Sequence, residues 1–118
     1  MEFVAFVGTD KENWGQITAL MNRIECESIF LVMNKDVSGF PTSEKCQVIR
    51  VDSSQGIVDL KNQIVEKLKP KLKGDFEASV SLASGSGKEH MAFIAALLSV
   101  PVGVKIAVYT KGGVEFIT

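Results

Sequence analysis

Two short polar loops carry the residues best suited to bind an anionic ligand. The first comprises Gly8, Thr9, Asp10 and Lys11, with Asn13 just beyond, and the second comprises Ser84, Gly85, Ser86, Gly87 and Lys88. Backbone N–H groups at the start of a helix attract phosphate groups, and the helix dipole adds to this attraction. A lysine adds a full positive charge. The second loop therefore predicts an anion or nucleotide site, provided that a helix follows it.

Known phosphate-binding motifs match the second loop only in part. A Walker A loop requires a glycine where Leu82 stands and a serine or threonine where Glu89 follows Lys88. The dinucleotide motif G-x-G-x-x-G finds its first two glycines in Gly85 and Gly87, but His90 takes the third position. The same glycines also suit a strand-to-helix turn that needs unusual φ angles. A purely structural turn therefore remains the alternative to an anion site.

The apolar pattern around these loops predicts strands that alternate with helices. Strands are expected over residues 3–7, 28–33, 46–52, 77–83, 105–110 and 114–118, and helices over 14–24, over 57–68 and after Gly87. Strands joined by helices pair in parallel through right-handed crossovers. The prediction is a single α/β domain over residues 1–118, a Rossmann-like three-layer sandwich with a mostly parallel sheet and a C-terminal β-hairpin. Residues 34–45 contain Gly, Pro and Ser where a helix is expected, so this crossover is predicted to lack one.

The expected topology brings the two loops together. In the usual strand order the first and fourth strands are neighbours, and ligands bind beyond the carboxyl ends of such strands. The third helix carries Met91, Ile94, Ala95 and Leu98 on one side and Phe93 and Leu97 on another. We therefore expect it to contact apolar neighbours on more than one face. Asp52, Ser53 and Ser54 are candidate N-caps of the second helix.

Composition excludes several classes of function. Thirteen Lys and Arg against fourteen Asp and Glu give a net charge of −1, which argues against direct binding to duplex DNA. No apolar run is long enough to span a membrane, and the N-terminus lacks the basic region of a secretion signal. Cys26 and Cys46 lie far apart and the chain has one His. We therefore expect no metal site, no cofactor, reduced thiols and a cytoplasmic location.

The order of these elements and the two loops together resemble the CRISPR-associated Rossmann fold (CARF) family. The specific matches are Gly8-Thr9-Asp10 after the first strand and Ser84-Gly85-Ser86-Gly87-Lys88 with Met91 after the fourth. Members of this family form two-fold dimers and bind cyclic oligoadenylates, the second messengers of type III CRISPR immunity. Some members also cleave the bound ring. A symmetric ring of phosphates suits a symmetric dimer, in which each crevice is present twice.

The resemblance implies roles for individual residues. The amides after Ser84 and Lys88 would hold phosphates, and Thr9, Asp10 and Asn13 would recognise ribose or base edges. Lys88 would be the catalytic residue of a metal-independent ring nuclease, because it can stabilise charge on the reacting phosphate. His90 is a less favoured candidate for a general base; a surface or capping histidine is the commoner outcome.

Three hypotheses remain open from the sequence. The chain is a homodimeric sensor that acts through a separate effector protein, a ring nuclease on the same scaffold, or a non-enzymatic interaction subunit without a ligand.

Overall fold

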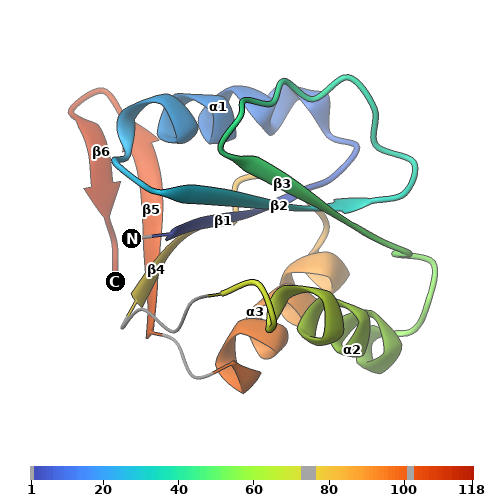
Figure 1. Cartoon of the computed structure of the whole chain (residues 1–118). Helices are drawn as coiled ribbons and strands as arrows, with labels where there is room; N and C mark the ends of the chain where they lie inside the picture. The colour runs from blue at the N-terminus through green and yellow to red at the C-terminus, as the bar shows by residue number, and fades with distance from the viewer. Residues whose placement is uncertain (1, 73–76, 101–102) are drawn as a thin grey trace.

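A six-stranded sheet separates one helix from two others in the computed structural model of the chain (Figure 1). The structure describes residues 2–72, 77–100 and 103–118. The strands are β1 (Glu2–Val7), β2 (Ser28–Asn34), β3 (Cys46–Val51), β4 (Glu77–Ser81), β5 (Gly103–Thr110) and β6 (Gly113–Phe116). The helices are α1 (Trp14–Arg23), α2 (Ile57–Leu68) and α3 (Gly87–Ser99), and a short 3-10 helix, η1 (Lys11–Asn13), precedes α1. The predicted three-layer α/β sandwich is confirmed.

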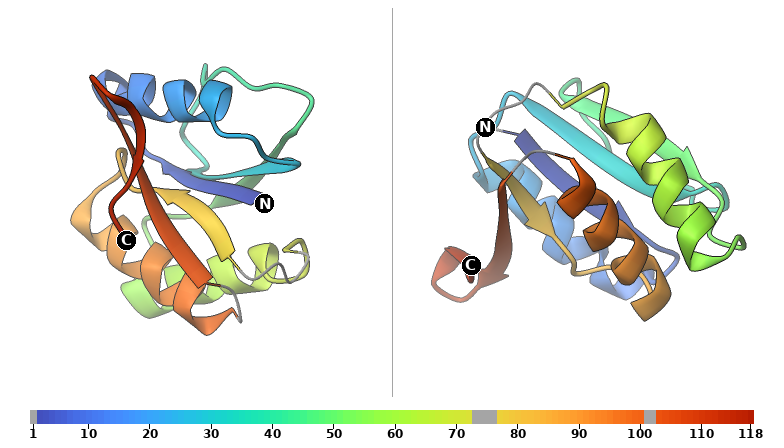
Figure 2. Two further views of the ribbon diagram at one scale, coloured as in Figure 1. Left: turned by 90° about the vertical axis from the view of Figure 1, so that its left-hand side faces the viewer. Right: turned by 90° about the horizontal axis from the view of Figure 1, so that it is seen from below.

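The strand order is β3-β2-β1-β4-β5-β6, so β1 and β4 are central neighbours as expected. The pairs from β3 to β5 are all parallel, and only β5 and β6 run antiparallel. Helix α1 covers one face of the sheet, while α2 and α3 lie side by side on the other (Figure 2). Strands β2 and β3 are added on one side of β1, and β4, β5 and β6 on the other, so the direction of strand addition reverses between the neighbours β1 and β4. Ligands of α/β sheets bind at such a point.

Burial on both faces explains why β1 is apolar from Phe3 to Val7. Phe3 and Ala5 pack into a core beneath α1, whereas Val4 and Phe6 pack into a second core beneath α2 and α3. All four side chains are fully buried. A strand covered on both faces needs no polar alternation, and this matches the continuous apolar run in the sequence.

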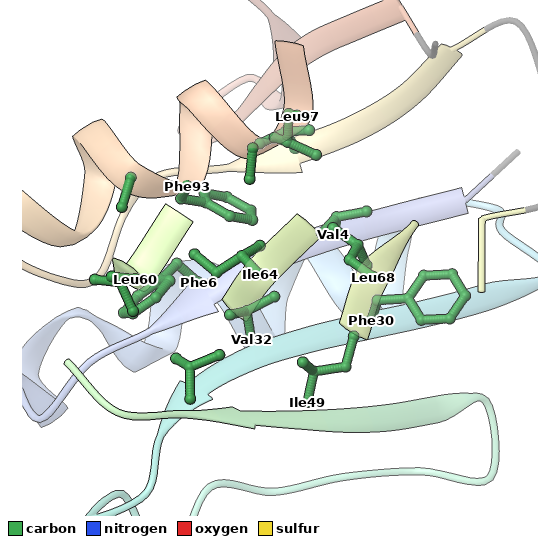
Figure 3. Packing of buried hydrophobic residues seen from close by; sticks show 14 of the residues in the cluster. Val4, Phe6, Phe30, Val32, Ile49, Leu60, Ile64, Leu68, Phe93 and Leu97 are labelled. Atoms are coloured by element: carbon green, nitrogen blue, oxygen red, sulfur yellow. The ribbon is translucent and has the colours of Figure 1, made fainter. Parts of the chain in front are cut away.

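The second core is formed by one face each of α2 and α3 (Figure 3). Leu60, Ile64 and Leu68 supply the face of α2, and each is completely buried. Phe93 of α3 meets Phe6 edge to face, with 5.9 Å between ring centroids. Complete burial of such a side chain stabilises the fold by about 1.5–3 kcal/mol.

The connection between β2 and β3 has no helix, as predicted, and two side chains cover the sheet in its place. Val37 and Phe40 are buried in the core beneath α1. The Phe40 ring packs against Trp14 of α1 at 5.3 Å between centroids. This loop therefore closes the α1 side of the sheet without a second helix.

The expected N-caps of α2 are wrong. Gly56 occupies the N-cap position, and no side chain caps the helix there. Asp52 instead accepts hydrogen bonds from the backbone N–H (3.0 Å) and hydroxyl (2.6 Å) of Ser54, which forms a local turn. These bonds hold the pKa of the Asp52 carboxyl well below its usual value.

Candidate functional site

The loops after β1 and β4 meet at the carboxyl edge of the sheet and are joined by one carboxylate. Asp10 Oδ1 accepts a hydrogen bond from the Ser84 hydroxyl at 2.5 Å and another from the Gly85 backbone N–H at 3.0 Å. The Ser84 hydroxyl in turn accepts from the Gly8 backbone N–H at 2.9 Å. We call these four residues, Gly8, Asp10, Ser84 and Gly85, the clasp. It confirms that the two predicted loops face each other.

Two of the glycines are required by the clasp itself. A Cβ on Gly8 would lie 2.8 Å from the Gly85 Cα and 2.9 Å from Asp10 Oδ1. Gly85 has a φ of +111°, and a Cβ there would lie 3.0 Å from the Phe6 ring. L-residues rarely adopt such a backbone conformation. The structural interpretation of the glycine turn is therefore sufficient for Gly85, and Gly8 in the first loop has a steric reason of its own.

Gly87 is different, because neither its φ angle nor a described neighbour requires a glycine there. It is exposed, its φ is not in the left-handed region, and a Cβ would meet no atom within 4 Å. A glycine at the first helical position has no side chain that could shield the backbone N–H groups. Among the described residues, no acceptor pairs with the backbone N–H groups of Gly87 and Lys88.

The first turn of α3 already holds two carboxylates of the chain. The Ser86 side chain accepts from the Glu89 backbone N–H at 3.2 Å, and Glu89 Oε1 accepts from the Ser86 N–H at 2.8 Å, which is a capping box. Asp10 accepts a hydrogen bond from the N–H of Gly85, which lies just before this turn. An anion at this helix end would therefore meet only the amides of Gly87 and Lys88.

Lys88 does not point freely into the crevice. Its Nζ donates a hydrogen bond to the Ser53 carbonyl at 2.8 Å, and the Ser53 hydroxyl donates to Glu89 Oε2 at 2.7 Å. The loop between β3 and α2 is thereby tied to the start of α3. Sequence reasoning missed this third loop. The Ser86–Glu89 spacing was a readable capping signal, but no local pattern marks Ser53.

Asp10 is stabilised in its charged form. Partial burial raises the pKa of the carboxyl, but hydrogen bonds from Asn13, Ser84 and Gly85 outweigh this effect and lower the pKa below its usual value. The Asn13 side-chain amide donates to Asp10 Oδ2 at 2.7 Å. Asp10 and Asn13 therefore bind each other, and a ligand that contacts either must compete with this bond.

The remaining candidates lie around the clasp. Thr9 and Lys11 are exposed on its rim, and the Lys11 ammonium lies 5.6 Å from the centre of the Trp14 ring. The Trp14 indole N–H donates to the Gly8 carbonyl at 2.9 Å, so Trp14 supports the loop after β1. His90 Nε2 lies 2.6 Å from the Ser84 carbonyl oxygen. A ring N–H that donates to this carbonyl would hold the loop between β4 and α3, which is a structural alternative to catalysis.

Helix α3 also presents an apolar surface to solvent. Phe93 and Leu97 are completely buried, whereas Met91 is 61% and Leu98 76% exposed. The two apolar sides predicted from the sequence are present. The expected apolar contacts on more than one face are only partly borne out, because Met91 and Leu98 are mostly exposed in the described part of the chain. Gly87, Met91, Ile94, Ala95 and Leu98, together with His90, line a broad, shallow hollow. We call these six residues the α3 stripe, and it begins at the same turn as the unpaired amides.

No protein-family model matches the chain, and no curated protein matches it. The resemblance to CARF domains therefore stays a prediction from the two loops and the order of elements. In the described ranges, no helix has the length and apolar character needed to cross a membrane. The same residues contain no group of three or more His, Cys, Asp or Glu side chains arranged to hold a metal ion.

Proposed function

We propose that the chain is a homodimeric sensor domain that binds a cyclic oligoadenylate, the second messenger of type III CRISPR immunity, at the carboxyl edge formed by β1 and β4. The resemblance of the two loops to CARF domains and the observed strand order support this function. The ligand site comprises the rim residues Thr9, Lys11 and Asn13 with the first turn of α3. The signal is passed to a separate effector protein.

Gly87 is the observation that carries the proposal. Helices accept most residues better than glycine, and no described residue apart from its neighbours along the chain lies within 4 Å of a Cβ placed at Gly87. A glycine is useful where another molecule approaches the backbone closely. The unpaired N–H groups of Gly87 and Lys88 are the groups that a phosphate would approach.

The α3 stripe supports the dimer. Met91 and Leu98 are exposed on one side of α3 with the half-buried Ile94 between them, and this helical spacing is the pattern of a helix that packs against a partner. A second copy of the chain can cover this stripe with its own. Because the stripe begins at Gly87, such a contact would lie next to the amides at the start of α3.

We propose binding rather than cleavage. A ring nuclease needs Lys88 at the reacting phosphate, but the Lys88 ammonium group donates a hydrogen bond to the Ser53 carbonyl.

A second function, an interaction subunit without a ligand, is favoured by a different observation. Asp10 and Glu89 already place two carboxylates at the start of α3. The experiments below separate these functions.

Thermal unfolding with cyclic tetra- and hexaadenylate tests ligand binding directly. A ligand that binds the folded state at a hundredfold excess over its dissociation constant stabilises it by about 2.7 kcal/mol. Linear oligoadenylate is the control for non-specific phosphate binding. The recovered ligand is then chromatographed: an intact ring indicates a sensor, and linear products that disappear in Lys88→Ala indicate a nuclease. No shift with either ring would reject the proposed ligand and favour the interaction subunit.

Two pairs of variants locate the site and the dimer. Gly87→Glu places a negative charge beside the open amides and should abolish the ligand-induced shift, while Gly56→Glu makes the same change at the start of α2, also in open space, and should preserve it. Leu98→Glu should convert the dimer to a monomer in light scattering. Val58→Glu is its control, because Val58 is 67% exposed on α2. A monomeric wild type would contradict the proposed dimer.

A further inference from the structure

A small apolar pocket opens where β4 and β5 separate. The pairing of these strands ends at Val80 and Ile106, after which β5 continues with β6 as its partner. The resulting pocket has a volume of about 240 Å³ and is lined mainly by Leu82, Ala83, Ile106, Val108 and Ile117, with Gln16 of α1. Among the described residues, no Lys, Arg, Asp or Glu side chain lines it. The pocket therefore does not suit a phosphate.

Gln16 gives this apolar pocket a group that can recognise a base. Its Oε1 accepts a hydrogen bond of 3.3 Å from the Tyr109 backbone N–H, and an amide oxygen has a second lone pair. In the described part of the chain, no acceptor pairs with the Gln16 side-chain NH₂ group. The amide thus offers one donor and one acceptor side by side. This pattern is complementary to N7 and the N6 amino group of adenine.

The pocket is continuous in sequence with the clasp. Ala83 lines the pocket, and the next residue is Ser84, the hydroxyl of which binds Asp10. On the other side, Gln16 follows Trp14, the indole of which binds the Gly8 carbonyl. A base in the pocket and a phosphate at the edge would therefore both contact residues that follow β1 and β4 in the chain.

We propose that this pocket binds a purine base of the ligand, with Gln16 as the residue that selects adenine. The inference rests on the proposed function for the identity of the ligand. The volume is below the roughly 300–1,000 Å³ of sites for drug-sized molecules, which suits one flat ring system. The apolar walls contact the faces of the ring, and the amide contacts its edge.

Cyclic tetraadenylate and cyclic tetrainosinate test the selectivity of Gln16. Inosine replaces the N6 donor of adenine with an oxygen, so wild-type protein should bind the adenine ring about tenfold more tightly. Gln16→Leu should lose this preference. Gln47→Leu makes the same change at an exposed position of β3 and should retain the preference. Equal discrimination in wild type and Gln16→Leu would overturn the assignment of Gln16.

Adenosine and uridine test the pocket separately from the ring. At millimolar adenosine, the methyl NMR signals of Ile106, Val108 and Ile117 should shift, and uridine should shift them much less. One outcome is that cyclic tetraadenylate stabilises the protein, but neither adenosine nor cyclic tetraadenylate shifts these methyl signals. The pocket inference is then overturned and the proposed function stands. If adenosine moves them but no ring binds, the pocket stands and the proposed ligand is wrong. Equal shifts with both nucleosides would overturn the purine assignment.

Discussion

The inward and outward sides of α3 differ in whether contacts within the chain explain their apolar residues. On the inward side, Phe93 and Leu97 are completely buried in the core beneath α2 and α3. On the outward side, Met91 and Leu98 are just as apolar but mostly exposed. The first pair stabilises the single chain, whereas the second pair gives it almost no stability and makes it more prone to associate. Residues of the second kind indicate what else the molecule contacts.

The two glycines at the start of α3 show the same contrast. Gly85 is held at a positive φ between the Phe6 ring and His90, so the fold needs it. Gly87 stands in open space with an ordinary backbone conformation. The fold explains one glycine of the predicted ligand loop and leaves the other for a partner or ligand to explain.

The largest effect should distinguish the two sides of α3. Phe93→Ala removes a fully buried ring and should lower the free energy of unfolding by about 3–5 kcal/mol. Leu98→Ala, measured on the monomer at low protein concentration, should change it by less than about 0.5 kcal/mol. Chemical denaturation followed by circular dichroism gives both values. Comparable losses would mean that the outward side packs within the single chain.

The next effect should distinguish the two glycines. Gly85→Ala forces an L-residue to a positive φ and places its Cβ against Phe6, so we expect a loss of about 1–3 kcal/mol from strain, with overlap in addition. Gly87→Ala should be neutral or stabilise the fold by about 0.4–1 kcal/mol, because it restricts the unfolded chain. Urea denaturation of both variants measures the difference. A destabilised Gly87→Ala would show that the chain does need this glycine.

Ser84→Ala should have a comparable or smaller effect. Ser84 is completely buried, and its loss leaves the Gly8 N–H without its acceptor and Asp10 without one of its donors. A buried group left unpaired costs about 1–3 kcal/mol. Ser99→Ala is the control, because the Ser99 hydroxyl is exposed and donates only to the Ala95 carbonyl. Equal stability of the two variants would indicate that water replaces the Ser84 hydroxyl.

The sequence was sufficient to predict that the two loops meet, but it did not predict the hydrogen bonds between them. Apolar runs and crossover rules predicted the strands and the neighbouring positions of β1 and β4, because these follow from burial and chain connectivity. The bonds of Asp10 to Ser84 and Gly85 join residues more than 70 positions apart, and no local spacing encodes them. Ser53 shows the same limit: it has the residue type of a helix cap, but its side chain binds Glu89 instead.

The smallest effect should appear on acidification. The hydrogen bonds to the Asp10 carboxylate keep its pKa in the folded state below the usual value near 3.8, so its contribution to stability is present above that value and is lost as the pH falls below it. Asp52, with a lowered pKa of its own, contributes in the same direction. Asp10→Asn should cost less than about 1.5 kcal/mol at neutral pH and should make the loss of stability below about pH 4 shallower.

Denaturation curves between neutral pH and about pH 3 for wild type, Asp10→Asn, Asp52→Asn and the double variant measure the two contributions. Because the two carboxylates lie in separate loops without a shared partner, their effects should add. If wild type and Asp10→Asn lose stability in parallel, the carboxylate does not hold the clasp in solution. The amides at the start of α3 would then be more accessible to a ligand than the hydrogen bonds of the clasp imply. Gly85 and Gly87 would then differ only in the backbone strain that each position imposes.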